Sequence, residues 1–120
     1  MNYREIENLK TVITQLAKKG CRLTSNDYGV NGRIVGIGFK PCWTNPVDSR
    51  IERLEFNCQD GSGSIIPFYL YNIIGFDIVS LDGEELDNSK KITLDMYVLS
   101  TERIKEMEGF ERVRINLAEN

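Results

Sequence analysis

The sequence predicts an α+β fold, in which one N-terminal amphipathic helix packs on a strongly curved antiparallel sheet of about five or six strands. Residues 3–19 repeat their apolar positions with the period of a helix, and most of the chain after residue 20 alternates with the period of a strand. Glycines within several predicted strands favour curvature, which would allow a small, partly open barrel. Because no linker or composition change divides the chain, residues 1–120 are expected to form a single domain.

The helix predicted over residues 3–19 has a plausible N-cap at Asn2 and a natural stop at Gly20. Its first turns carry acidic residues and its last turn carries lysines, which suits the helix dipole. We expect the apolar stripe to cover one face of the sheet, although a partner-binding helix would show the same pattern. The stripe consists of Ile6, Leu9, Val12, Ile13, Leu16 and Ala17.

Three strands are predicted in the first half of the chain, over residues 21–25, 33–39 and 50–58. In the second of these, the alternation places Val35, Ile37 and Phe39 on one face. Pro41 is expected to end this strand, so that residues 40–49 form a loop that carries the only tryptophan, Trp43. In the third strand the pattern predicts one buried face, consisting of Leu54, Phe56 and Cys58.

The long apolar run from residue 65 to 81 is predicted to form two strand segments, because Pro67 and Gly75 interrupt it. Its even positions are expected to be buried: Phe68, Leu70, Ile74, Phe76 and Ile78.

The C-terminal third is predicted to contain a hairpin at Asp82–Gly83, a strand over residues 92–98, a short helix over residues 100–109 and a last strand over residues 112–117. Ser100 would cap the short helix and Gly109 would end it.

Composition excludes several chemistries. The chain contains no histidine, which removes Ser-His-Asp and Cys-His catalysis, and its three cysteines are widely spaced without a Cys-x-x-Cys pair. We therefore expect no catalytic residue, no metal and no cofactor. The net charge of −3 argues against generic DNA binding. With no signal-like or membrane-spanning apolar stretch, a cytoplasmic location is expected.

The segment Asp60-Gly-Ser-Gly-Ser64 resembles a phosphate-binding loop only in its glycines. A P-loop needs a Lys-Ser/Thr pair and a following helix, whereas Ile-Ile-Pro-Phe-Tyr-Leu follows here and has strand character. We therefore predict the tip of a β-hairpin.

The function that we expect is that of a small non-enzymatic binding or regulatory protein that acts through a protein–protein surface. Its size would suit an inhibitor encoded by a mobile genetic element. The expected partner-binding residues are large aromatics, Trp43, Tyr69, Tyr71 and Tyr97, because Tyr and Trp dominate such sites. A homodimer is also expected, because an uncapped edge strand or the apolar odd positions Ile73 and Val79 would need covering.

The alternative is a receptor or sequestering protein for a nucleotide-like ligand or nucleic acid, in which tyrosines stack on bases and arginines hold phosphates. The candidate ligand-binding residues are Arg33, Arg53, Arg103, Arg112 and Arg114.

Overall fold

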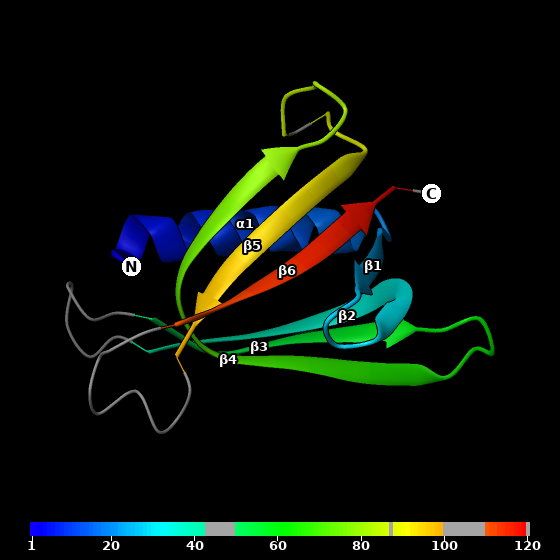
Figure 1. The fold of residues 1–120 in the computed structure, drawn as a ribbon, viewed down its shortest axis with the longest axis horizontal. Coiled ribbons are helices and arrows are strands. Elements are labelled where there is room, and N and C mark those ends of the chain that lie inside the picture. The colour runs from blue at the N-terminus through cyan, green and yellow to red at the C-terminus, as the bar shows by residue number, and fades with distance from the viewer. Residues whose placement is uncertain (43–49, 87, 100–109, 120) are drawn as a thin grey trace.

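The computed structural model describes residues 1–42, 50–86, 88–99 and 110–119, and it confirms a helix with an antiparallel sheet (Figure 1). Trp43, Arg103 and the helix predicted over residues 100–109 lie outside the described residues. The elements are α1 (Tyr3–Lys18), β1 (Arg22–Ser25), β2 (Val30–Cys42), β3 (Arg50–Gln59), β4 (Ile65–Ser80), β5 (Lys91–Val98) and β6 (Glu111–Ala118).

Helix α1 begins and ends as its sequence predicts. The side chain of Asn2 accepts a hydrogen bond from the backbone N–H of Glu5 at 2.9 Å, which satisfies one of the unpaired donors of the first turn. Gly20 takes a φ of 65°, a left-handed conformation that suits glycine, and turns the chain into β1.

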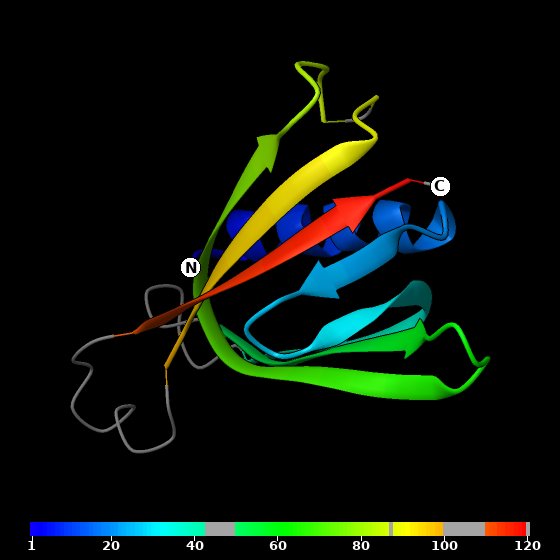
Figure 2. The same cartoon turned by 45° about the vertical axis from the view of Figure 1, so that its right-hand side comes forward.

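The six strands close into a ring, in which each strand pairs with its sequence neighbours and β6 pairs back with β1 (Figures 1 and 2). The long strand β4 joins the two halves of this ring. Its first half pairs with β3 and its second half, from Ile73, pairs with β5. We expected an uncapped edge strand that would need a covering partner. This expectation is wrong for the sheet as a whole, although one stretch of β4 keeps a free edge.

Strand β4 is continuous through 16 residues and bends at Asn72, so the prediction of two separate segments was wrong. Asn72 has a φ of 55°, and its side-chain oxygen accepts a hydrogen bond from Arg50 Nε at 3.2 Å. The register to β5 is irregular between Ile73 and Gly75. The bend at Asn72 moves the buried positions from Leu70 to Ile73. Ile73 is fully buried, which corrects the expectation that it is a surface residue. Val79 is exposed, as expected.

A second bulge changes the alternation in β2. The register to β3 shifts between Ile34 and Gly36, so Ile34, Ile37 and Phe39 all pack against the core. Val35 is exposed instead of sharing a face with Ile37 and Phe39, which corrects the predicted alternation. Pro41 does not end the strand, which runs on to Cys42.

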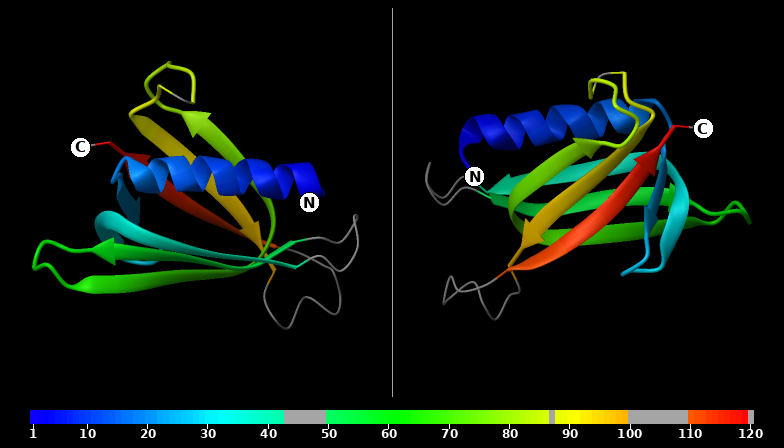
Figure 3. Two further views of the ribbon diagram at one scale, coloured as in Figure 1. Left: turned by 180° about the vertical axis from the view of Figure 1, so that it is seen from behind. Right: turned by 45° about the horizontal axis from the view of Figure 1, so that its top comes forward.

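One hydrophobic core joins the helix to both halves of the ring. Seen from behind, α1 runs along the side where the two halves face each other (Figure 3). Its four buried residues are Ile6, Leu9, Ile13 and Leu16. They pack in one cluster with residues that include Leu54, Phe56, Phe68, Leu70, Ile92, Leu94, Met96, Val113 and Ile115. Within the described part of the chain, no helix is long and apolar enough to cross a membrane.

Candidate functional site

Two tyrosines stack on the outer face of the first half of β4. The rings of Tyr69 and Tyr71 are 6.2 Å apart and 23° from parallel, with 41% and 53% of the residues exposed. Across the sheet they pair with Glu55 and Arg53 of β3. Glu55 lies beside the Tyr69 hydroxyl and raises the pKa of Tyr69. We call these four residues the Tyr69–Tyr71 surface.

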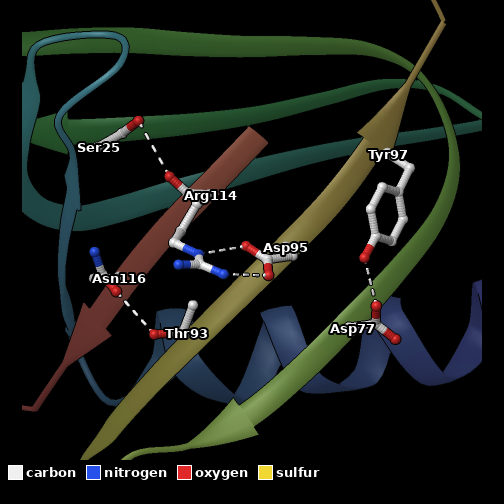
Figure 4. A network of polar contacts seen from close by, with 7 residues as sticks. All are labelled: Ser25, Asp77, Thr93, Asp95, Tyr97, Arg114 and Asn116. Atoms are coloured by element: carbon white, nitrogen blue, oxygen red, sulfur yellow. Dashed lines mark hydrogen bonds and ion pairs between the residues drawn. The ribbon is translucent and has the colours of Figure 1, made fainter. Parts of the chain in front are cut away.

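Tyr97 lies on the other half of the ring, where it pairs with Gly75. Its hydroxyl donates a hydrogen bond to Asp77 at 2.5 Å, and this bond raises the pKa of Tyr97 (Figure 4). Phe110 packs edge-on against its ring at 5.2 Å. The structure therefore separates Tyr97 from the Tyr69–Tyr71 surface.

The candidate arginines are distributed over different parts of the ring. Arg53 belongs to the Tyr69–Tyr71 surface, whereas the guanidinium of Arg33 lies against Gly20. Arg112 pairs with Tyr97 on the outer face of β5 and β6. Arg114 makes a two-point contact with Asp95, at 2.8 and 2.9 Å, so a phosphate would have to replace this carboxylate (Figure 4). The candidate arginines that the structure describes do not form a cluster, and a nucleotide-like ligand remains a prediction.

Strands β5 and β6 carry a satisfied polar network on this outer face (Figure 4). Thr93 and Asp95 are each only 9% exposed. Thr93 donates a hydrogen bond to Asn116 at 2.9 Å, and the hydrogen bonds from Arg114 hold the pKa of Asp95 below its usual range. Among the described residues, no buried side-chain nitrogen or oxygen lacks a partner. The polar groups of this network therefore have their partners within the protein, and no ligand is needed to account for their burial.

The Asp60–Ser64 loop is the tip of the β3–β4 hairpin, as predicted. Asp60 Oδ1 accepts hydrogen bonds from the backbone N–H groups of Ser62 and Ser64 at 2.9 and 3.0 Å, and Gly63 takes a φ of 86°. The hydrogen bonds from Ser62 and Ser64 lower the pKa of Asp60. Because an internal carboxylate uses these donors, the loop does not present them to a phosphate.

Sequence reasoning missed a cavity beside the β1–β2 turn. It has a volume of about 490 Å³ and lies between residues 28–31 and the first half of β4. The ring of Tyr28 packs 5.3 Å from that of Phe68, and Cys58 contributes a buried thiol whose pKa is raised by burial. An aromatic residue within a polar turn was the only signal in the sequence.

Comparisons with protein-family models, with curated proteins and with solved structures found no match. In the described part of the chain, no group of three or more Cys, Asp or Glu side chains is placed to hold a metal ion. The function therefore has to be argued from the surfaces themselves.

Proposed function

We propose that this chain is a small non-enzymatic protein that binds another protein through the Tyr69–Tyr71 surface. The observation that carries the proposal is the stacked, solvent-exposed pair of tyrosines on a paired strand. Exposed tyrosines beside an arginine have the composition of protein-binding hot spots, in which a few Tyr, Trp and Arg residues supply most of the affinity.

The arrangement also reduces the entropy that binding would cost. Tyr69 stacks on Tyr71 and lies beside Glu55, and these contacts restrict its rotamer in the free protein. Immobilising a flexible side chain on binding costs about 0.5–1.5 kcal/mol, and a restricted side chain avoids part of this cost. We leave Tyr97 out of the proposed surface, because Asp77 and Phe110 already engage its hydroxyl and its ring.

The proposal is tested by affinity capture with three immobilised proteins from a lysate of the cells that produce the chain. These are the wild type, the double variant Tyr69→Ala/Tyr71→Ala and the control Val79→Ala. Val79 is an exposed apolar residue of the same strand, beyond the bend. We expect at least one protein to be captured by the wild type and the control and to fall about tenfold or more on the double variant, as loss of hot-spot residues predicts.

Thermal unfolding of the same proteins supplies the second readout. Exposed tyrosines contribute little to the core, so the double variant should melt within about 4 °C of the wild type. Equal capture by all three proteins would contradict the proposal. A large fall in melting temperature would mean that the two rings stabilise the fold and do not serve a partner.

A further inference from the structure

The first half of β4 has a free edge. Residues 65–71 pair with β3 on one side, whereas β5 joins the other side of β4 only from Ile73 onward. No described backbone group bonds to the outer side of this stretch. An edge of this kind presents a row of N–H and C=O groups that can pair with another chain.

The backbone hydrogen-bond pattern identifies which residues direct their N–H and C=O groups to this free edge. In an antiparallel pair, successive residues direct their backbone groups to opposite sides of the strand. The C=O of Ser64 accepts a hydrogen bond from Asp60 of the β3 side at 3.0 Å, so the even positions face β3. Pro67 is at an odd position, and the backbone groups of odd positions point away from β3. Its missing N–H therefore removes no hydrogen bond to a β3 carbonyl. The free donors therefore belong to Ile65, Tyr69 and Tyr71.

The cavity beside the β1–β2 turn borders this edge. It is lined on the β4 side by Ile66, Pro67 and Phe68, and on the other side by Tyr28 and its neighbours. Its volume of about 490 Å³ lies within the roughly 300–1,000 Å³ of ligand clefts. Ile66 is 49% exposed there, although it shares its parity with the buried Phe68. A chain lying along the edge would cover this apolar surface.

The rim of the cavity is acidic. Asp60 lines it directly, and Asp27 and Glu111 lie close enough to Tyr28 to raise the pKa of its hydroxyl, after the larger effect of burial. Two guanidiniums lie near these carboxylates, and both are engaged. Arg22 donates to Asn31 at 2.9 Å, and Arg114, which lies close enough to Asp27 to interact with it, is paired with Asp95. Three carboxylates against two engaged guanidiniums favour a positively charged occupant.

We propose that the edge formed by residues 65–71 binds an extended, positively charged segment of a partner protein, which adds a strand beside β4. This proposal rests on the proposed function, because it names the partner segment that would lie next to the Tyr69–Tyr71 surface. A second copy of the chain fits the site less well. It would bring a second acidic rim against the first.

The first experiment measures binding of a fluorescein-labelled peptide, Lys-Val-Lys-Val-Lys-Val-Lys with blocked ends, by fluorescence anisotropy. The matched peptide carries Glu in place of Lys. Because charge complementarity favours the cation, the Lys peptide should bind at least tenfold more tightly, and the difference should shrink with salt. Equal affinity for the two peptides, or no binding of either, would overturn the proposal.

Two variants of one residue isolate the backbone contact. Tyr69→Ala and Tyr69→Pro both remove the ring, but only the proline removes the N–H at the free edge. Pro67 shows that an odd position in this half of β4 can be occupied by proline. We expect the Lys peptide to bind Tyr69→Pro at least tenfold more weakly than Tyr69→Ala, and equal binding would exclude strand addition at this edge.

Hydrogen exchange of the wild type keeps the test independent of whether the proline variant folds. Without peptide, the amides of residues 66, 68 and 70 should be protected and those of residues 65, 69 and 71 should exchange rapidly. Saturating Lys peptide should protect the second set. Protection of the second set without peptide, at micromolar protein, would show that a second copy covers the edge and would overturn the proposal. If the peptide fails here while Tyr69→Ala/Tyr71→Ala still loses its captured protein, the side-chain surface acts without the edge.

Discussion

Replacing Asn72 tests the bend that separates the free edge of β4 from the paired half. A left-handed conformation costs a residue with a Cβ about 1 kcal/mol, and asparagine tolerates it better than alanine does. Alanine also removes the side-chain oxygen that accepts the hydrogen bond from Arg50, a bond worth about 1 kcal/mol. Asn72→Ala should therefore lower the free energy of unfolding by about 2 kcal/mol.

Glycine at the same position separates these two contributions. Asn72→Gly loses the same hydrogen bond to Arg50 but adopts the φ of 55° without steric cost. Its loss should therefore be about 1 kcal/mol, roughly half that of the alanine variant.

Urea unfolding followed by far-UV circular dichroism measures both values, with the m-value as a check that the unfolded states are comparable. Two results would show that the left-handed conformation of residue 72 does not contribute to stability. One is a free energy of unfolding of Asn72→Ala equal to that of the wild type, and the other is an Asn72→Gly variant less stable than Asn72→Ala. The left-handed residue would then not be what separates residues 65–71 from β5.

Three further variants test other parts of the structure by the same unfolding measurement. Ile13→Ala removes a buried side chain of α1 and should cost about 2–5 kcal/mol, while a loss below about 1 kcal/mol would mean that the helix is not part of the core. Gly32→Ala would place a Cβ 2.8 Å from a backbone oxygen of β3 and should cost about 1–3 kcal/mol. At Gly38 the closest atom to a new Cβ, at 2.9 Å, is the flexible end of Glu55, so Gly38→Ala should cost less, and equal losses would contradict this packing. Asp95→Asn should be less stable than the wild type at pH 7, because the lowered pKa of Asp95 gives stability that is present above its unfolded value of about 3.9 and is lost as the pH falls through the folded value. If the difference in the free energy of unfolding between wild type and Asp95→Asn did not become smaller by pH 3, the ion pair of Asp95 with Arg114 would not be its cause.

Local patterns predicted most of the elements. The spacing of Ile6, Leu9 and Ile13 identified the helix, and the alternation of Leu54 with Phe56 identified β3, because both depend on residues close in sequence. The even positions Phe68 and Leu70 are buried as predicted.

The failures share one physical cause, which is that they depend on the pairing of distant strands. The bulge near Val35 adds a residue on β2 and reverses the alternation beyond it. In β4 the bend at Asn72 and the bulge after Ile73 bring Ile73 into the core, while Phe76 and Ile78 beyond them keep the predicted parity. The burial of Asp95 depends on Arg114 of the adjacent strand. The alternation does place Tyr69 and Tyr71 on one side of their strand, opposite Phe68 and Leu70, since parity is set locally, but the exposure of that side is a finding of the structure. It could not predict the cavity or the free edge beside them, because both depend on how the β1–β2 turn and β5 are placed relative to the first half of β4.

The pairing of β1 with β6 has a consequence for how the chain folds. Arg22 pairs with Ala118, so the ring closes between residues 96 positions apart (118 − 22 = 96). Contacts of such sequence separation must be formed against a large loop-closure entropy, and topologies rich in them fold slowly. The helix and the β3–β4 hairpin can form early from local contacts. During synthesis, β1 can pair with β2 at once, but its second partner, β6, emerges only after nearly the whole chain. Through that interval the other edge of β1 is open to incorrect pairing.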